Sequence, residues 1–404
     1  MSAREDKLRP LALIANPCNR RADFFQAALR RLGLAPAVLV PYLNLVADPG
    51  DLAGHIDPGS LVRIDSPGED FEVEKGLLLL GADAAESEGC AHLTASDVRR
   101  LAFDRGRIWF PRQWYLGYCR LLSCVELACK PRSCTLRNEP ADIRLMFDKH
   151  SCHDLCRRAG VSVPPALQDV TCFEDLIAKM GNTGLDRVFV KLSHGSSASG
   201  VIALQRTPAG AQAFTSAEIV VTGGQVRLYN SLKIQHYTRT TLIAKLVDEL
   251  CRHRVHVEQW LPKAAIDRST FDLRIVVIGG EPRHVVARKS RSPITNLHLG
   301  NRRGEIAPLL ERLGPHRWSD VLESCRSAAA LFPNSLSMGI DMCLSPGWRR
   351  HAVLEINAFG NLLPGVEWRG MDTYTAEVAA ITAMGHTNES GRKRLVSERS
   401  LDAR

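Results

Sequence analysis

The chain has 404 residues, 45% of them hydrophobic, so it is long enough for two or three packed subdomains. Its 52 Lys and Arg residues against 44 Asp and Glu residues give a net charge of +8, without a long basic run. This balance favours small anionic ligands such as nucleotides, and we expect no nucleic-acid partner. No stretch approaches the roughly 18 apolar residues of a membrane span and no long apolar leader begins the chain, so we expect a cytoplasmic protein without membrane contact.

The N-terminal third alternates between strand and helix patterns. LALIAN (11–16) predicts a buried strand, ADFFQAALRRLGL predicts a helix that ends at Gly33, and AVLVPYL predicts a second strand. Such an opening is typical of an open parallel sheet, so we expect a Rossmann-like α/β domain over residues 1–125. No GxGxxG fingerprint follows the first strand, and a dinucleotide site is therefore not expected.

The middle of the chain mixes both patterns. DIRLMFDKHSCHDLCRRAG (142–160) predicts one helix, and RVFVKL (187–192) predicts a strand that leads into the flexible loop HGSSASG (194–200) and a returning strand. TTLIAKLVDEL (240–250) has apolar residues at helical spacing, and VHVEQWL (255–261) predicts a strand. Twelve cysteines are scattered through the chain without paired zinc-type spacing, including a series at every fifth residue from Cys119 to Cys134; we expect reduced thiols of no assigned function.

The C-terminal third predicts two hairpins. LRIVVIGGEPRHVVARK (273–289) turns at GGEP, and after a helix the strands GIDMCL (339–344) and AVLEIN (352–357) are joined by a Pro-Gly turn. Residues 386–404 are polar and predict a frayed tail.

The last predicted hairpin carries oxygen-bearing side chains within apolar strands. Glu355 and Asn357 are two residues apart and so share a face, and pairing of the two strands brings Asp341 near them. Two carboxylates and an amide oxygen are ligands that Mg²⁺ accepts. Without a cation the carboxylates would repel each other, and one pKa should rise. The alternative is a surface ion pair of these acids with Arg349 or Arg350.

This ending resembles the ATP-grasp superfamily, in particular RimK-like and glutathione-synthetase-like carboxylate–amine ligases. The resemblance extends backward in order through four further segments: FDLRIVVIGGEPRHVVARKSRSPITNLHLGNRRG (271–304), VEQWLP (257–262), FVKLSHGSSASGV (189–201) and DKHSCHDLCRRAGVSVPP (148–165). It covers residues 140–380, while the N-terminal third matches only as a generic domain that precedes the grasp fold.

The resemblance implies an α/β fold in which an N-terminal α/β domain precedes a two-subdomain ATP grasp. The central, lysine-bearing subdomain is expected over residues 140–262 and the magnesium-binding subdomain over residues 263–385. It also implies ATP and Mg²⁺ as cofactors, with Mn²⁺ as a substitute. The expected activity is ADP-forming ligation of a carboxylate to an amine, or to a thiol, through an acyl phosphate on a small molecule or peptide. A grasp-fold protein that binds nucleotide without ligation, and an ATP-dependent phosphotransferase or pyrophosphotransferase, remain alternatives, and a homodimer is left open.

The resemblance also assigns roles to individual positions. Arg274 and Arg288 would stabilise the transferring phosphoryl group as catalytic residues, and Asp341, Glu355 and Asn357 would bind the metal. The nucleotide-binding positions are Lys149, Lys191, Ser196, Ser197, Gly200, Glu258, Trp260 and Leu261.

Several of these positions also have an ordinary structural interpretation. Lys191 could be a plain strand-end lysine, although its apolar neighbours argue against this. A solvated helix lysine would explain Lys149, a mobile turn would explain the serine loop, ordinary core packing would explain Trp260, and a strand-edge arginine would explain Arg288. Lysine point charges and free loop N–H groups nevertheless suit a polyphosphate.

Three further positions could contact phosphate, metal or substrate. Asn296 is carried over from the resemblance, whereas Arg302 and Arg303 replace a glycine-richer loop of the family and could bind a second carboxylate or remain solvated. The segment FPRQWYLGYCR (110–120), with Arg112, Trp114 and Tyr115, could line an acceptor pocket, although core packing or a domain interface is the more usual role of such a cluster.

Overall fold

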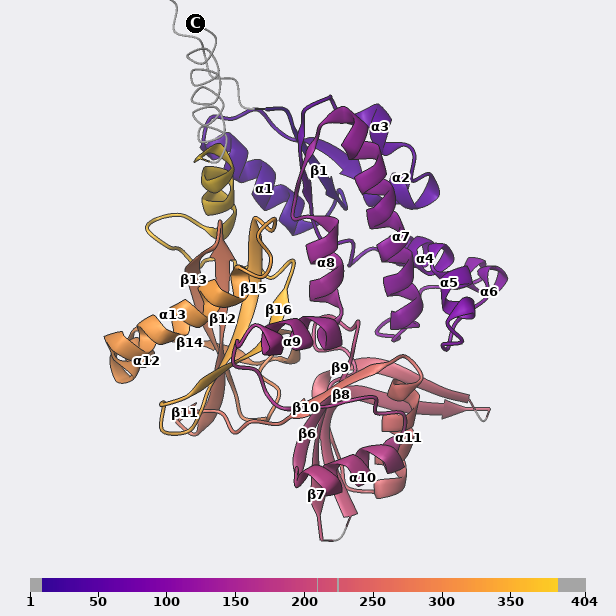
Figure 1. Cartoon of the computed structure of the whole chain (residues 1–404). Helices are drawn as coiled ribbons and strands as arrows, with labels where there is room; N and C mark the ends of the chain where they lie inside the picture. Colours follow the sequence, from indigo (N-terminus) through magenta and orange to yellow (C-terminus); the bar gives the residue numbers. More distant parts are fainter. Residues whose placement is uncertain (1–8, 209, 224, 384–404) are drawn as a thin grey trace, which may run out of the picture.

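A computed structural model describes residues 9–383 except 209 and 224, so the predicted polar tail at 386–404 lies outside the described residues. Three sheets follow one another along the chain, at the top, bottom and left of Figure 1. Within the described part, the protein contains no helix whose length and hydropathy would allow it to cross a membrane.

The first sheet is parallel, with the strand order β2-β1-β3-β4. Its strands are β1 (Leu11–Ala15), β2 (Val38–Pro41), β3 (Leu61–Ile64) and β4 (Thr135–Arg137). Its helices are α1 (Arg20–Arg31), α2 (Tyr42–Ala47), α3 (Leu52–His55), α4 (Phe71–Leu80), α5 (Ala82–Ser87), α6 (Ala95–Arg99) and α7 (Pro111–Cys129). The predicted parallel sheet is therefore present, and it extends past residue 125, which falls inside α7.

Two short helices lead into the second sheet, α8 (Pro140–Phe147) and α9 (Lys149–Arg158). The prediction of one continuous helix here was wrong, because the chain leaves helical geometry at Asp148, with ψ of 97°. The Asp148 side chain accepts a hydrogen bond from the Ser151 N–H at 3.1 Å and so caps α9. This break makes Lys149 the first residue of α9.

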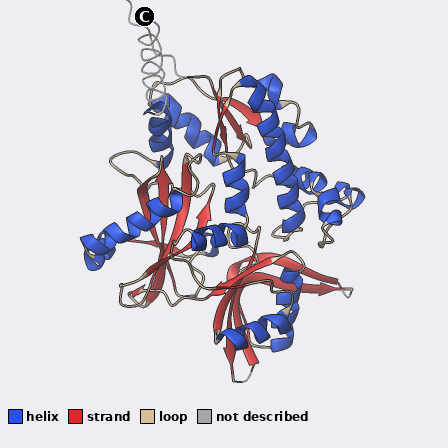
Figure 2. Cartoon of the chain, viewed as in Figure 1, coloured by secondary structure: helices blue, strands red, loops and turns tan. Residues whose placement is uncertain are grey.

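The second sheet is antiparallel, with the order β5-β10-β6-β7-β8-β9. Its strands are β5 (Ala166–Leu167), β6 (Arg187–Leu192), β7 (Ile202–Thr207), β8 (Gly210–Thr222), β9 (Gln225–Tyr237) and β10 (Val255–Gln259). Helices α10 (Phe173–Thr183) and α11 (Thr240–Cys251) cover one face, where their apolar residues and those of the strands form one core (Figure 2).

The third sheet is also antiparallel, with the order β14-β13-β12-β15-β16 and with β11 (Ala265–Ile266) paired to β12. Its strands are β12 (Ser269–Ile278), β13 (Glu281–Ser290), β14 (Arg302–Gly304), β15 (Ser337–Leu344) and β16 (His351–Asn357), accompanied by α12 (Ala307–Leu313) and α13 (Pro315–Ala329). Both predicted hairpins are present, and Asp341 lies opposite Glu355 in the register.

The larger of two apolar clusters that join the first and third sheets is centred on α7 and β15. Ile14 of β1, Tyr118 of α7, Ile275 of β12 and Ile340 of β15 are each at most 1% exposed and belong to the same cluster. Burial on this scale is the main stabilising term of a fold. The cluster thereby holds the first sheet against the third sheet, beside which the candidate site lies.

Candidate functional site

A cavity of about 520 Å³ lies where residues from all three sheet regions meet. It is lined by most of the residues that the sequence singled out: Lys149, Lys191, Ser196, Ser197, Glu258, Arg274, Arg288, Asn296, Asp341, Glu355 and Asn357. These residues are far apart in the sequence, so only the fold brings them together. Both the volume and the mixed polar and apolar lining are typical of a small-molecule site.

Lys191 forms a buried ion pair at the second sheet. Its strand β6 lies antiparallel to β10, and the Lys191 Nζ is 2.6 Å from Oε1 of Glu258. Burial alone would raise the pKa of Glu258, but Lys191 and then His256, 3.2 Å from the carboxylate, lower it to about 2. Burial alone would lower the pKa of Lys191, but Glu258 and Glu355 raise it. The ammonium is therefore charged and fixed at the cavity wall, where a solvated lysine would be mobile.

Lys149 reaches the cavity from the first turn of α9. Its Nζ donates to the carbonyl oxygen of Gly195 at 2.5 Å and lies 3.1 Å from Oε1 of Glu355. Its side chain is only 11% exposed. Lys149 therefore joins the serine loop to strand β16, and the solvated-lysine interpretation does not fit.

The loop 194–200 closes one side of the cavity with Gly195 and three serines. Ser197 and Ala198 both have positive φ, 52° and 59°, and the Ser199 N–H donates to the Ser196 carbonyl at 2.8 Å. The loop has little side-chain bulk toward the cavity, which suits contacts between its backbone and a phosphate.

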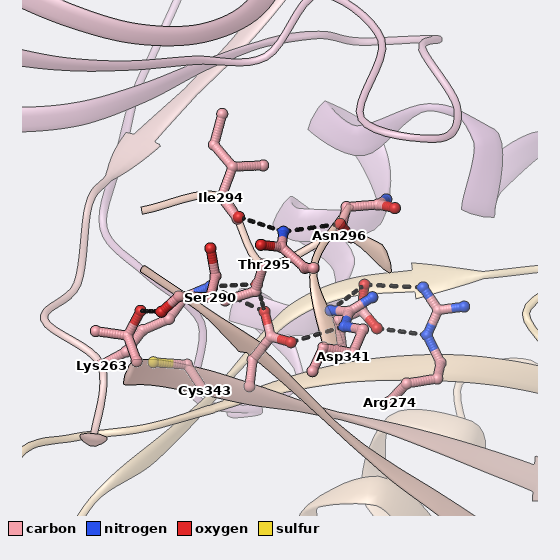
Figure 3. Close-up of polar contacts among 12 residues, drawn as sticks. Lys263, Arg274, Ser290, Ile294, Thr295, Asn296, Asp341 and Cys343 are labelled. Carbon is pink, nitrogen blue, oxygen red and sulfur yellow. Dashed lines mark hydrogen bonds and ion pairs between the residues drawn. The ribbon is translucent and has the colours of Figure 1, made fainter. Parts of the chain in front are cut away.

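Arg274 and Arg288 both bind Asp341. The Arg274 guanidinium binds the carboxylate through Nε at 2.5 Å and Nη2 at 2.9 Å (Figure 3). The Arg288 Nη2 lies 3.1 Å from the same carboxylate. Burial alone would raise the pKa of Asp341, but Arg274 and Arg288 lower it. The strand-edge interpretation of Arg288 fails, because its side chain is only 8% exposed.

The structure adds three residues that the sequence reasoning missed. Asp272 lines the cavity two residues before Arg274, on the same face of β12, and binds Arg288 Nε at 2.7 Å and Lys263 Nζ at 2.8 Å. Thr295 also donates to this carboxylate. The Asp-Leu-Arg alternation at 272–274 was the available signal, since residues two apart on a strand share a face.

The proposed metal ligands lie on facing strands, as expected, but their charges are already balanced. Asp341 binds the two arginines and Glu355 binds Lys149, so neither Arg349 nor Arg350 is its partner in the described structure. The expectation that repulsion raises one of the two pKa values was wrong for Asp341, because the arginines outweigh its burial.

The donor set still fits Mg²⁺. Asn357 Nδ2 donates to the Gly339 carbonyl at 3.3 Å, which leaves its amide oxygen available at the cavity beside the oxygens of Glu355 and Asp341. Oxygen ligands of this kind, completed by substrate phosphates and water, are what Mg²⁺ prefers.

Five predicted positions do not line the cavity: Gly200, Trp260, Leu261, Arg302 and Arg303. At Gly200 a Cβ would lie 2.8 Å from Leu192 Cδ1, so this glycine serves packing. The Trp260 N–H donates to the Arg187 carbonyl at 3.1 Å, and the indole contacts Phe189 and Arg187. These contacts lend no support to the predicted nucleotide-binding role of Trp260.

Arg302 and Arg303 instead belong to edge strand β14. Both are exposed, and Arg303 Nη1 donates to the Pro364 carbonyl at 2.6 Å. Asn296 does line the cavity, but its side-chain oxygen accepts the His298 N–H at 2.9 Å. Its amide group therefore points at least partly to its own turn, so a metal-ligand role gains no support.

The aromatic segment 110–120 forms the N-cap and the first half of α7 and does not line the cavity. Arg112 pairs with Glu88 at 2.6 Å, and Trp114 packs with Tyr118 and Phe147. Tyr115 stacks on His194 with ring centroids 4.0 Å apart. The segment is therefore core and interface, the more usual of the two roles considered for it.

No protein-family model matches this chain, and no curated protein matches it. Solved structures are nevertheless similar over nearly its whole length. The D-cycloserine synthetase DcsG shares 13% sequence identity with a TM-score of 0.51, covering 92% of this chain and 98% of that chain. The macrocyclase MdnC from Microcystis aeruginosa MRC, bound with the precursor peptide MdnA, shares 12% identity with a TM-score of 0.50, covering 93% and 99%.

A third similar structure is the ATP-grasp ligase PsnB, complexed with a phosphomimetic variant of its minimal precursor, Mg and ADP. It shares 15% identity with a TM-score of 0.50, covering 94% of this chain and all of that chain. Identities this low establish the fold alone. The predicted fold is confirmed: the chain has the ATP-grasp fold.

Proposed function

We propose that the protein is an ATP-dependent ligase that joins a carboxylate to an amine through an acyl phosphate, releasing ADP and phosphate. The observation that carries this proposal is the set of five cations in one cavity, each held by a carboxylate of the protein. These are Lys149, Lys191, Lys263, Arg274 and Arg288. A triphosphate substrate needs several cations around it. Because the protein already holds these side chains in place, they need not rearrange during the reaction.

The first step is phosphoryl transfer to the carboxylate substrate. A carboxylate oxygen attacks the γ-phosphorus, the bond to the β-phosphate oxygen breaks, and ADP leaves. Arg274 and Arg288 are placed to stabilise the negative charge on the transferring oxygens, because Asp341 and Asp272 fix their orientation. Lys149 and Lys191 would hold the polyphosphate as point charges.

Asp341, Glu355 and Asn357 would hold the magnesium ion. When bound, Mg²⁺ neutralises phosphate charge and acts as a Lewis acid on the transferring group. Lys149 then has a phosphate as an alternative partner to Glu355, which would free that carboxylate for the metal.

In the second step the amine nitrogen attacks the acyl carbon, phosphate leaves, and the nitrogen loses a proton. No nucleophile from the protein is required. The similar structures support this class of reaction, since DcsG is a synthetase, MdnC is a macrocyclase and PsnB is a ligase complexed with Mg and ADP. By analogy, a peptide or a small molecule would supply the carboxylate and amine.

The test is ATP turnover by the full chain with Mg²⁺ and pooled carboxylates and amines, with separate detection of ADP, AMP, phosphate and pyrophosphate. We expect ADP and phosphate only when both substrates are present, and Arg274→Gln should reduce this turnover by about 100-fold or more. Arg349→Gln, outside the cavity, is the control.

Two outcomes would reject the proposal in different ways. Formation of AMP and pyrophosphate would indicate adenylation or pyrophosphoryl transfer. Tight binding of Mg-ATP with no turnover across the pools would favour a nucleotide-binding protein without ligase activity.

A further inference from the structure

One cationic side chain of the cavity differs from the rest. The two lysine–glutamate pairs and the cluster around Asp272 and Asp341 account for every other Lys and Arg that lines the cavity. Arg21, from the first turn of α1, also lines it but has no carboxylate within ion-pair distance in the described part of the chain. A guanidinium has five N–H donors, and within residues 9–383 only the Nη1 group of Arg21 donates to a side chain.

That single contact orients Arg21 firmly. Nη1 donates to Oδ1 of Asn361 at 2.9 Å, and Asn361 is only 2% exposed. The Asn361 Nδ2 donates in turn to Oε1 of Glu377 at 2.6 Å, which fixes which end of the amide faces Arg21. Glu377 is fully buried and bound by Arg63 at 3.0 Å, and Arg63 also binds Asp65 at 2.7 Å. A buried polar network with every member hydrogen-bonded is rigid.

The contrast with Arg63 separates a structural arginine from one directed at a ligand. Arg63 is 4% exposed and pairs with two buried carboxylates, so its charge is compensated within the protein. Arg21 is only partly buried and borders the cavity, and among the described residues its one side-chain hydrogen-bond partner is the neutral amide of Asn361. Its charge also helps to lower the pKa of Asp65, which lies beyond ion-pair distance and is already bound by Arg63. The charge of Arg21 is therefore available to a ligand.

The topology places Arg21 where open parallel sheets bind ligands. The order β2-β1-β3-β4 makes the chain turn to opposite sides after β1, so a crevice opens between the carboxyl ends of β1 and β3. Arg21 follows β1, and Ser66, Gly68 and Glu69 follow β3; all four line the cavity. The Asn16 side chain donates to the Gly68 carbonyl at 3.0 Å and thereby fixes the second loop to the first.

We propose that Arg21 recognises an oxyanion, a carboxylate or a phosphate, on the substrate that enters at this crevice. This inference rests on the proposed ligase function. It assigns the nucleotide to the five paired cations and the second substrate to the part of the same cavity that the N-terminal domain lines. The Arg21 fork offers two parallel N–H donors to such a group, with a geometry fixed by Asn361.

The test uses the full chain loaded with Mg-AMPPNP, so that the nucleotide phosphates occupy their own site. The ¹⁵N-labelled protein is titrated separately with acetate and with methyl phosphate, and the arginine Nε–Hε signals are followed by NMR. The Arg21 signal is assigned by its absence in Arg21→Gln. We expect it to shift saturably with at least one of the two probes, and the probe that acts identifies the oxyanion as carboxylate or phosphate.

Variants separate recognition from folding. Arg21→Gln should weaken binding of the active probe by about tenfold or more, while Arg21→Lys, which keeps charge but loses the fork, should weaken it less. Arg20→Gln is the matched control, since Arg20 is exposed, neighbours Arg21 and does not line the cavity. Thermal melts check that each variant is folded.

The inference is overturned if neither probe shifts the Arg21 signal, or if Arg21→Gln binds the active probe as well as the unaltered protein does. Failure of Mg-AMPPNP to bind would count against the proposed function instead, and the same titration without nucleotide would still report on Arg21. Once substrates are known, Arg21→Gln should raise the KM of the oxyanion-bearing substrate at least tenfold and leave the KM of ATP unchanged.

Discussion

Lys149 and Glu355 form an ion pair of 3.1 Å that ties the first residue of α9 to strand β16 across the cavity. The Glu355 side chain is 27% exposed, whereas the Lys149 side chain is 11% exposed. Lys149 keeps a second partner in the Gly195 carbonyl at 2.5 Å. The carboxylate can therefore be lost without leaving the ammonium unpaired, which separates its effect on function from its effect on stability.

Glu355→Gln is expected to change stability little and activity greatly. The lost pair is partly solvated, so the free energy of unfolding should fall by no more than about 1 kcal/mol. Turnover of Mg-ATP should fall by about 100-fold or more if Glu355 holds the metal. Urea denaturation and ADP release, measured on the same preparations, provide the two numbers.

Arg350→Gln is the matched control for that variant. It tests the alternative in which Glu355 acts only in a surface ion pair with an arginine of the preceding turn, and we expect it to alter neither quantity. A Glu355→Gln protein that unfolds much more readily but turns over ATP normally would rule out the metal-ligand role.

Lys191→Met should affect both stability and nucleotide binding, because it leaves Glu258 buried without its cation. We expect a loss of about 3–5 kcal/mol in the free energy of unfolding. The double variant Lys191→Met/Glu258→Gln removes the unpaired charge and should recover most of this loss. Calorimetry should show that Mg-ATP binding, weakened by about 1.5–3 kcal/mol, is not recovered. If the double variant recovered the affinity for Mg-ATP as fully as the free energy of unfolding, Lys191 would have a purely structural role.

The same pair predicts a pH dependence. The pKa of Glu258 is about 2 in the fold against 4.5 ordinarily, so its contribution to stability is complete above pH 4.5 and is lost as the pH falls through 2. From this shift the contribution is about 3 kcal/mol. In urea denaturation from pH 7 down to 3.5, the free energy of unfolding of the unaltered protein should fall below pH 4.5 relative to that of the double variant, which lacks this carboxylate. A constant difference would contradict the assignment.

The sequence predicted the geometry correctly where a short pattern determines both the type of element and the face to which its side chains point. Asp341 lies opposite Glu355 in the register of β15 and β16, as the predicted hairpin implied, whereas the pairing of β12 with β15, which places Arg274 opposite Asp341, was not predicted. Ordered motifs supplied the rest of the grasp fold, including the lysine strand β6. The Asp341–Glu355 register lies within one hairpin and so follows from local pairing.

Other features depend on contacts that no local pattern encodes. Arg21 meets Asn361 across 340 positions of sequence, and Arg63 meets Glu377 across 314. The predicted helix over 142–160 broke because a cap at Asp148 outweighed its continuous apolar spacing. Trp260 lies outside the cavity lining, because its N–H donates to the Arg187 carbonyl and its ring packs on Phe189. In each case a tertiary or capping interaction decided the geometry.

Asp272→Asn tests the residue that the sequence reasoning overlooked. Burial alone would raise the pKa of Asp272, but Arg288 and Lys263 lower it, so its stabilising effect is present at neutral pH and is lost in acid. Neutralising it leaves two buried cations with one anion fewer, and we expect a loss of about 3–5 kcal/mol in the free energy of unfolding. Turnover should also fall, because Arg288 loses its 2.7 Å contact to this carboxylate.

Asp267→Asn is the control, since Asp267 pairs with Lys289 at 3.0 Å but its side chain is 80% exposed. It should leave stability within about 0.5 kcal/mol of the unaltered protein. If Asp272→Asn behaves in the same way, the cluster does not position Arg288.

The last prediction concerns the close approach of two glycines beside the metal-ligand strand. A Cβ built on Gly360 would lie 2.7 Å from the Gly339 backbone nitrogen, and one built on Gly339 would lie 2.9 Å from the Gly360 carbonyl oxygen. That carbonyl also accepts from Arg274 Nη1 at 3.4 Å, and Asn357 donates to the Gly339 carbonyl. The contact therefore positions a catalytic arginine and a metal ligand together.

Gly360→Ala should push the loop that follows Asn357 away from β15, because the facing atoms are backbone and cannot rotate aside. Overpacking of this kind costs about 1–3 kcal/mol of stability. The displaced loop includes the carbonyl that accepts from Arg274. Turnover should therefore fall even when it is measured at a temperature at which the variant is still folded. Gly54→Ala in α3 meets no atom within 4 Å and should be neutral or slightly stabilising. A Gly360→Ala protein with unaltered melting and turnover would show that the loop relaxes freely, and the close glycine contact would then have no part in placing Arg274 or Asn357.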